Sequence, residues 1–422
     1  MREPHVASAA PTSKILELFD SDFISDPHPT LAKLREESPA HLVATPNGLK
    51  TWLVTRYEDA KALLTDPRVS KDMRVGYGLV PQNFADPEKQ AHFQAQRGTR
   101  KQFATELSTT MLDSDPPDHT RLRKLVAKAF TMRQVEALRP RITELVTELL
   151  DAIEDRDEVD LMDALSFPVP FTVICWLLGV PPEDRDKFRR WSNLLTSGQG
   201  SEEALDASQD MVGYLRALIA DKRENPADDM LTALIEATDE GEKLDEIELI
   251  SMAFLLLVAG HETTVNLLNT GTLALLTNPD QRALLAADAG LWDSAIDEFL
   301  RIDAPLANAT WRFTLEPIRL GDVLIPKGEF ITISLSAAGR DPKRYTDPDR
   351  VDITRKNSGH LAFGHGIHHC IGAPLARLEG RIVLGELFRR FPRLSLATPK
   401  DELSWRPSFN LRGLASLPVR LR

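Results

Sequence analysis

Two short segments of the chain combine residue types that can do chemistry. The first, Ala362 to Arg377, reads AFGHGIHHCIGAPLAR and holds three histidines, one cysteine and three glycines. The second, Ala259 to Thr264, reads AGHETT and places a carboxylate and two hydroxyls inside an apolar run. Thiolates and imidazoles bind metal ions, and an acid beside a hydroxyl can move protons. The two segments therefore suggest a metal or cofactor ligand and a proton relay.

The role of Cys370 is open to three interpretations. A single free cysteine most often serves as a small buried apolar side chain, and Cys175 in the run FTVICWLLG fits that role. A zinc site is the second interpretation, although consecutive residues wrap poorly around one tetrahedral ion. The candidate zinc ligands would be His365, His368, His369 and Cys370.

The third interpretation makes Cys370 an axial ligand of haem iron. A thiolate is stabilised by backbone N–H donors and by the positive end of a helix dipole. The loop around Cys370 is rich in glycine and a helical pattern begins directly after it, so the loop and the helix could supply both. The glycines are Gly364, Gly366 and Gly372.

The segment AGHETT, which we call the polar island, also has two interpretations. At helical spacing Ala259, Glu262 and Thr263 share one face, which Leu255 and Asn266 extend. In the first, Thr263 donates back to the carbonyl of Ala259 and Glu262 forms an ion pair, as buried polar groups usually do. In the second, the acid and the hydroxyl donate protons to a bound ligand.

The composition is that of a globular protein with an acidic balance. The chain has 422 residues, of which 42% are hydrophobic and 27% charged, and a net charge of −12, which disfavours nucleic acid and anionic membranes. Two cysteines without CxxC spacing exclude a disulfide framework and favour a reducing cytoplasm. The longest apolar stretch, Ile250 to Gly260, is too short to span a bilayer, and the N-terminus lacks the apolar region of a signal peptide.

The elements that position these segments are mainly helices. Apolar residues recur at intervals of three and four from Pro117 onward, and the longest predicted helix runs from Asp245 until Pro279 ends it. Strand-like alternation is confined to residues 41–56, 316–335 and 403–421. We therefore expect one mainly α domain with a minor β part over residues 16–422, preceded by a flexible tail at 1–15.

Three motifs together resemble the cytochrome P450 family. FGHGIHHCIG is similar to the haem-thiolate loop F-G-x-G-x-H-x-C-x-G, AGHETT to the oxygen-activation motif A-G-x-[DE]-T, and EFLR to the E-x-x-R pair. The motifs lie in the family's order, and the resemblance runs from about Phe19 to the C-terminus. DPPDHTRLRKLVAKAFT and LLLVAGHETTVNL most resemble soluble bacterial enzymes that hydroxylate macrolides and related secondary metabolites.

The resemblance implies the P450 fold, with haem b (iron protoporphyrin IX) buried between the long central helix and the Cys370 loop. Cys370 would be the iron ligand, and Thr263 with Glu262 would deliver protons during O₂ activation. Cations would bind the haem propionates, and the loop and central helix would contact the porphyrin. The implied propionate partners are His119, Arg123, Arg312 and His368, and the implied porphyrin contacts are Phe363, Gly364, Gly372 and Ala259.

The resemblance also implies a structural network and external electron donors. Glu298 and Arg301 of EFLR, with Arg350 of DPDRVD, resemble the family's Glu-Arg-Arg network, which supports folding and haem loading. The chain has no flavin or iron–sulfur signature, so electrons would come from NAD(P)H through a ferredoxin reductase and a small acidic ferredoxin. The expected docking surface near Cys370 is basic and comprises Arg121, Lys124, Lys128, Arg377 and Arg381.

The substrate is expected to meet Leu255, Ala259, Leu306 and Phe409. Residues 70–110 carry no clear pattern and would form an extended lid. This lid has six basic and four acidic residues, including the cluster RGTRK at 97–101. An anionic substrate or an acidic carrier-protein thioester would complement that charge, and a solvated loop is the alternative.

The sequence therefore predicts a haem-thiolate monooxygenase, an oxidoreductase that acts on paired donors and incorporates one atom of O₂. It would hydroxylate or epoxidise a small molecule in secondary-metabolite biosynthesis, as a cytoplasmic monomer that binds neither nucleic acid nor membrane. One alternative is a haem-thiolate enzyme for oxidative coupling or ring formation. The other is a non-catalytic haem sensor, against which Thr263 and Glu262 argue because a sensor needs no proton relay.

Overall fold

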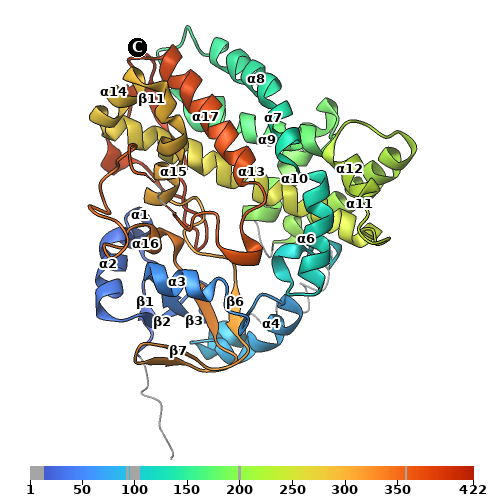
Figure 1. Cartoon of the computed structure of the whole chain (residues 1–422), viewed down its shortest axis with the longest axis vertical. Helices are drawn as coiled ribbons and strands as arrows, with labels where there is room; N and C mark the ends of the chain where they lie inside the picture. The colour runs from blue at the N-terminus through green and yellow to red at the C-terminus, as the bar shows by residue number, and fades with distance from the viewer. Residues whose placement is uncertain (1–13, 92–94, 96–104, 198–200, 357–358) are drawn as a thin grey trace, which may run out of the picture.

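The computed structural model describes residues 14–91, 95, 105–197, 201–356 and 359–422, so the expected tail at 1–15 lies almost wholly outside it. Helices fill most of the molecule, and a smaller strand region lies below them in Figure 1. This confirms the predicted class, mainly α with a minor β part. The helix α13 (Glu246–Thr277) passes through the helical region (Figure 1).

The strand region joins the N-terminal part of the chain to a segment far along the sequence. Its main sheet has the order β1-β2-β3-β9-β6-β4, and β3 pairs in parallel with β9, with Trp52 opposite Ile331. The predicted hairpin is present as β2 and β3, and Gly48 at its turn has a φ of +83°. The six strands are β1 (Leu16–Glu17), β2 (Ala40–Ala44), β3 (Lys50–Val54), β4 (Val69–Ser70), β6 (Arg312–Thr314) and β9 (Phe330–Ile333).

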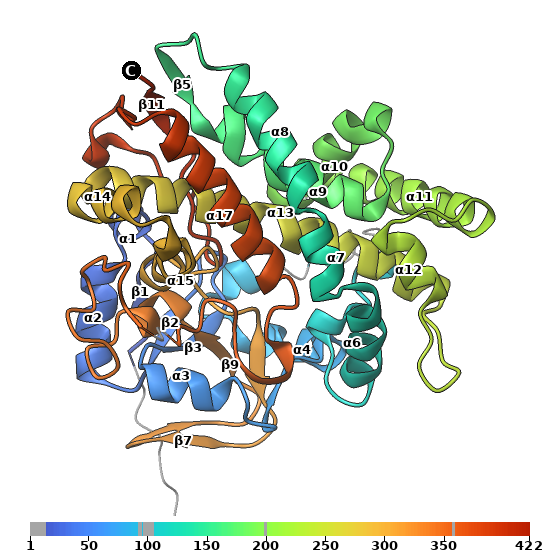
Figure 2. The same cartoon turned by 45° about the horizontal axis from the view of Figure 1, so that its top comes forward.

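One smaller sheet and four short helices complete this part of the fold, and a third sheet lies at the opposite end of the molecule, near α8 (Arg139–Asp151) (Figure 2). The predicted strands after residue 316 are β7 (Ile318–Leu320) and β8 (Val323–Ile325), which form one hairpin. The third sheet contains β10 (Ser395–Leu396), β11 (Pro418–Arg420) and β5 (Glu158–Asp160). The short helices beside the main sheet are α1 (Ser21–Ser25), α2 (His28–Glu37), α3 (Tyr57–Leu63) and α16 (Leu335–Gly339).

The helical region surrounds α13. Figure 2 shows α17 crossing α13, and the two helices are in contact, as are α13 and α9. The surrounding helices are α6 (Asp118–Ala129), α7 (Met132–Ala137), α8 (Arg139–Asp151), α9 (Pro168–Leu178), α10 (Arg185–Ser197), α11 (Glu202–Glu224), α12 (Met230–Glu236), α14 (Pro279–Ala287), α15 (Trp292–Ile302) and α17 (Ala373–Arg390).

The helix α13 has clear start and stop signals. The Asp245 carboxylate accepts a hydrogen bond from the Glu248 N–H, and the Glu248 carboxylate accepts one from the Asp245 N–H, which is a capping box. The helix ends at Thr277, two residues before Pro279, which begins α14. Its 32 residues exceed the apolar run at 250–260 because the helix continues through the polar island. Length and composition would suffice to cross a bilayer, but half of its most apolar stretch is buried inside the protein, as in the core helix of a globular domain.

Residues 73–83 correct the expectation of a patternless loop at 70–110. The helix α4 spans Met73–Leu79, and a 3₁₀ turn spans Pro81–Asn83. The Asp72 carboxylate accepts a hydrogen bond from the Arg74 backbone N–H and so starts α4. Two glycines in α4 lower its intrinsic helix propensity, which is why its pattern is weak in the sequence. The RGTRK cluster at 97–101 lies outside the described residues.

The expectation of strands at 403–421 is only partly correct. Most of the segment forms a hairpin over residues 405–414, which we call the terminal hairpin. Trp405 bridges Leu414, and the Arg406 N–H donates to the Gly413 carbonyl at 2.9 Å. Leu411 bridges Leu306, which fixes the hairpin to the segment after α15.

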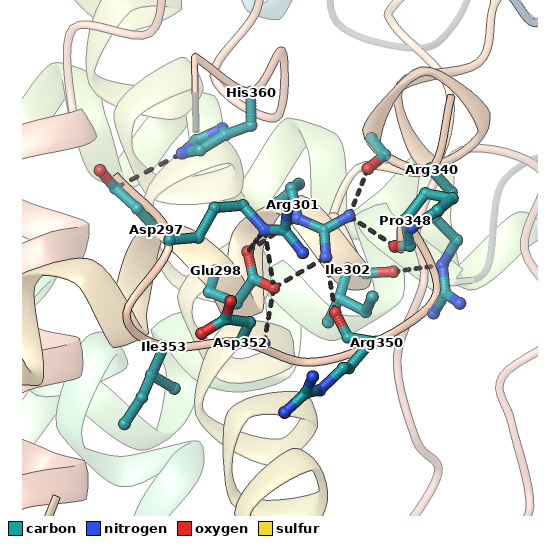
Figure 3. Close-up of polar contacts among 12 residues, drawn as sticks. Asp297, Glu298, Arg301, Ile302, Arg340, Pro348, Arg350, Asp352, Ile353 and His360 are labelled. Carbon is teal, nitrogen blue, oxygen red and sulfur yellow. Dashed lines mark hydrogen bonds and ion pairs between the residues drawn. The ribbon is translucent and has the colours of Figure 1, made fainter. Parts of the chain in front are cut away.

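A buried ion-pair network ties α15 to the chain that leads to the Cys370 loop (Figure 3). Arg301 donates to both carboxylate oxygens of Glu298, at 2.7 and 2.8 Å, and both side chains are fully buried. The remaining Arg301 N–H groups donate to carbonyl oxygens of Gly339, Pro348 and Arg350. All five guanidinium hydrogens are therefore used, which is what makes burying this charge tolerable.

The structure corrects the second arginine of this network. Arg350 contributes only its backbone carbonyl, at 3.1 Å from Arg301, and its side chain points away in Figure 3. The side chain that reaches Glu298 is Arg355, at 3.3 Å. Both arginines follow α15 in irregular chain, where residue spacing does not show which side chain turns inward.

Substitutions in this network should separate the two arginines. Glu298→Ala leaves Arg301 buried without its carboxylate and should cost about 3–5 kcal/mol of unfolding free energy. Arg355→Ala removes a partly exposed pair and should cost about 1 kcal/mol, and Arg350→Ala should stay within about 0.5 kcal/mol of the parent. Denaturant unfolding measures all three. A larger loss for Arg350→Ala than for Arg355→Ala would contradict the assignment.

Candidate functional site

The loop before α17 folds back on itself around Cys370. The Cys370 N–H donates to the Phe363 carbonyl at 2.8 Å, and the His369 N–H donates to Gly366 at 3.0 Å. Gly364 and Gly366 have φ values of +72° and +73°, the left-handed region that glycine enters without strain. The glycine-rich sequence therefore reflects two tight turns that present Cys370 at the start of α17.

The Cys370 sulfur lies where backbone N–H groups converge. Desolvation raises the pKa of its thiol, while the N–H groups of Gly372 and Ala373 and the cations Arg123 and Arg377 lower it. These groups favour a negative sulfur, as the sequence analysis expected of a loop that enters a helix. Cys175 differs, because burial among apolar side chains raises the pKa of its thiol to about 12.

The expected propionate partners come from three separate parts of the chain. His119 and Arg123 lie on α6, Arg312 begins β6, and His368 lies in the Cys370 loop. The ring centres of His119 and His368 are 4.3 Å apart. Within the described residues, both ring nitrogens of His119 and Nε of Arg312 are buried without a hydrogen-bond partner. The structure thus brings these side chains together and leaves donors unused.

The pKa values in this cluster show a lack of negative charge. Desolvation lowers the pKa of His368 to about 2, helped by Lys71 and neighbouring cations. Desolvation also lowers the pKa of Arg312 to about 10. Arg123 is partly engaged, because its guanidinium donates to the His369 carbonyl at 2.6 Å. A site that disfavours its own positive charges in this way suits a ligand that carries carboxylates.

Lys71 joins this cluster, although it belongs to the segment that was expected to form a lid. Its side chain is 1% exposed, and its ammonium donates to the Thr310 hydroxyl at 2.6 Å. The antiparallel pairing of β4 with β6 places Ser70 opposite Phe313, so the next residue, Lys71, lies beside Arg312. Lys71 and Thr310 are 239 positions apart, and no sequence motif marks that pairing.

The polar island lies in the middle of α13. The Thr263 hydroxyl donates to the Ala259 carbonyl at 2.8 Å, which confirms the back-bonded geometry. Ala259 is exposed and Glu262 and Thr263 are half-buried, so this face of the central helix is accessible. His261 faces elsewhere, between the rings of Phe167 and Phe171, and its Nδ1 contacts the Leu257 carbonyl.

The remaining residues that were expected to contact haem or substrate lie in different parts of the structure. Phe363 borders the Cys370 loop, with the Arg377 guanidinium 4.6 Å from its ring centre. Leu255 is half-buried on α13, and Leu306 bridges the terminal hairpin. Phe409 lies in that hairpin, but its ring packs against Phe19 at 4.9 Å and borders a cleft between the hairpin and the N-terminal helices.

The expected docking surface is less basic than the sequence suggests. Each of its five cations makes an ion pair with a carboxylate of the same chain, which offsets much of the local charge. The pairs are Arg121 with Glu248 and Glu242, Lys124 and Lys128 with Asp239, Arg377 with Asp297, and Arg381 with Asp293. Ile367, which is 51% exposed in the Cys370 loop, adds an exposed apolar side chain to this face.

The zinc interpretation finds no support in the geometry. In the described part of the chain, no group of three or more His, Cys, Asp or Glu side chains is arranged to hold a metal ion. His365, His368 and His369 therefore do not converge with Cys370 as co-ligands. A metal at this loop would take one protein ligand, as haem iron does in a thiolate protein.

Comparisons with known proteins agree with this geometry. The family profile for cytochrome P450 matches residues 190–413. The chain is 52% identical to cytochrome P450 107B1 of Saccharopolyspora erythraea, over 95% of this chain and 96% of that protein. It is 47% identical to the cytochrome P450 monooxygenase PikC of Streptomyces venezuelae, over 98% and 96%. The solved structure of the tirandamycin C-bound P450 monooxygenase TamI has a TM-score of 0.86 at 47% identity, covering 96% of this chain and all of that one.

The Cys370 loop should tolerate no side chain at Gly366. A Cβ there would lie 2.7 Å from the Thr65 methyl and 3.2 Å from the Leu64 carbonyl, on a backbone with positive φ. Gly366→Ala should therefore cost at least about 1–2 kcal/mol of unfolding free energy. Gly213→Ala in α11 is the control: its Cβ would meet nothing within 4 Å, and better helix propensity should add about 0.5–1 kcal/mol of stability. Equal effects of the two substitutions would refute the close packing of the loop.

Proposed function

Because the chain belongs to the cytochrome P450 family, we propose that Cys370 is the thiolate ligand of a haem b iron. The observation that carries this is the meeting of a thiol, at the start of α17, with a buried cluster of cations. Unused donors on His119 and Arg312 suit the two haem propionates, and Arg123 and His368 complete the expected set. Phe363, Gly364, Gly372 and Ala259 would contact the porphyrin.

The chain is a monooxygenase of the secondary-metabolite type, an oxidoreductase that uses O₂ to oxidise a small organic substrate. Haem, when bound, supplies the O₂-activating chemistry. We propose that the substrate is a macrolide or a related polyketide-like metabolite and that the reaction is hydroxylation or epoxidation. The likeness to PikC and to TamI, whose solved structure holds tirandamycin C, supports this class of substrate.

The residues of the polar island have a role that their geometry supports. The Thr263 hydroxyl donates to the Ala259 carbonyl, so its oxygen can accept a hydrogen bond, and rotation of the hydroxyl would turn its hydrogen toward a bound ligand. Glu262 precedes it on the same accessible face and can exchange protons with solvent. The small side chain of Ala259 leaves room for a flat cofactor against α13. We therefore propose that Glu262 supplies protons and Thr263 passes them to the reaction centre.

Electrons have to arrive from outside the chain. We propose the expected route from NAD(P)H through a reductase and an acidic ferredoxin, which docks on the face around the Cys370 loop. Ile367 and the exposed ends of Lys124 and Lys128 lie on this face. Because Asp239 pairs with both lysines, the attraction would be modest and salt-sensitive. We expect the enzyme to act as a cytoplasmic monomer.

Substitution of the hydroxyl tests the proton relay. Thr263→Ala should bind substrate as the parent does but lose most coupling, so that NAD(P)H consumption continues while hydrogen peroxide replaces product. Thr264→Ala is the matched control, because Thr264 makes the same kind of bond, to the Gly260 carbonyl at 3.3 Å, from a buried face. Product and peroxide are measured per NAD(P)H consumed. Unchanged coupling in Thr263→Ala, or equal losses in both variants, would contradict the relay.

The reaction class is tested with labelled oxygen. Macrolides, terpenoids and carrier-tethered acids are first screened for a low-to-high-spin shift in the absorption spectrum. The compound that shifts the spectrum is then turned over under ¹⁸O₂ with a ferredoxin and its reductase. The proposal predicts one ¹⁸O atom in the product. A coupled or cyclised product without ¹⁸O would overturn monooxygenation in favour of oxidative ring formation.

A further inference from the structure

We infer that Lys71 is a further anion-binding residue of the haem site and that it holds one propionate together with the hydroxyl of Thr310. This inference rests on the proposed function, because the propionate belongs to the proposed haem. It adds Lys71 to the four basic residues that the family resemblance implies. The two side chains are 239 positions apart in the sequence, and the pairing of β4 with β6 brings them together.

The position of Lys71 is fixed by the sheet. Its own N–H donates to the Asp115 carboxylate at 3.0 Å, which anchors the backbone beside the start of α6. The pairing of Ser70 with Phe313 then sets Lys71 beside Arg312, on the edge of β6. Its ammonium extends to the Thr310 hydroxyl, at 2.6 Å, and the side chain is 1% exposed. Lys71 therefore has neither the freedom nor the exposure of a surface lysine.

The charges around Lys71 do not balance. In the described part of the chain, its ammonium forms no ion pair with a carboxylate. The nearest acids are otherwise engaged: Asp115 accepts from the Lys71 backbone and from the Ser70 hydroxyl, and Asp113 accepts from the Thr110 hydroxyl at 3.2 Å. Like charges that lie side by side in adjacent strands destabilise a sheet, and a buried cation without an anion is unfavourable.

Burial and repulsion both favour loss of the proton on the Lys71 ammonium. Desolvation, and then the guanidinium of Arg312, lower the pKa of Lys71 to about 7, with Asp113 and Asp115 only partly opposing them. A carboxylate placed between Lys71 and Arg312 would remove both penalties at once. The Thr310 hydroxyl accepts from Lys71 and still has its own hydrogen to donate, so ammonium and hydroxyl form a two-donor site for one carboxylate group.

Haem retention in the holoenzyme tests this assignment. Lys71→Met keeps the length of the side chain and removes the charge, so haem transfer to excess apomyoglobin should become about tenfold faster, the loss expected for one charged hydrogen bond. Lys71→Arg should stay within about threefold of the parent because it keeps the cation. Lys33→Met, on an exposed lysine that pairs with Glu37 one helical turn away, should leave the rate unchanged.

A second readout separates propionate binding from a merely structural role. The propionate bending bands in the resonance Raman spectrum should shift in Lys71→Met and in Thr310→Val and should return toward the parent in Lys71→Arg. The double variant that combines Lys71→Met with Thr310→Val should lose haem at about the rate of the faster single variant, because both side chains hold the same group. Thr310→Val keeps the test available if Lys71→Met does not fold.

The inference and the proposed function can fail separately. If the wild-type protein carries no thiolate-ligated haem, the proposed function fails. If it carries such haem and both the transfer rate and the propionate bands are unchanged in Lys71→Met and Thr310→Val, only the assignment of Lys71 is overturned. Faster haem loss with unshifted propionate bands would also overturn it, because the effect would then be structural.

Discussion

The burial of basic side chains at close range is the constraint on which this site depends. Lys71, His119, Arg312 and His368 reach one place from four segments, and few carboxylates accompany them. Such an arrangement gains free energy when it binds an anion, because each cation recovers the charge that burial disfavours. The cluster adjoins the loop that presents Cys370, so a flat cofactor with one metal and two carboxylates satisfies both features together.

Two rigid parts of the fold hold that arrangement. The helix α13 supplies one wall, and its polar island offers a small residue, an acid and a hydroxyl on an accessible face. The Glu298–Arg301 pair supplies the other support, because it fixes α15 to the irregular chain that leads into the Cys370 loop. Since α17 packs on both α13 and α15, the thiol and the polar island are held in a fixed relation.

Features that depend on local residue spacing could be predicted from the sequence. Glu298 and Arg301 lie one helical turn apart, and the glycines of the Cys370 loop mark its turns. Features that depend on register or on irregular chain were missed. Arg355 replaces Arg350 because neither lies in an element with a period. Lys71 enters the site through the pairing of β4 with β6, which brings it to Thr310, 239 positions away. The carboxylate partners of the basic face are also remote in sequence.

The central claim is that Cys370 binds haem iron as a thiolate. The ferrous–CO spectrum of the purified protein tests it most directly, because only an anionic sulfur ligand produces a strongly red-shifted Soret band. We expect that band for the wild type and for Cys175→Ser, because the Cys175 thiol is buried away from the site. A Soret band at the position typical of histidine ligation, or a protein that binds no haem, would contradict it.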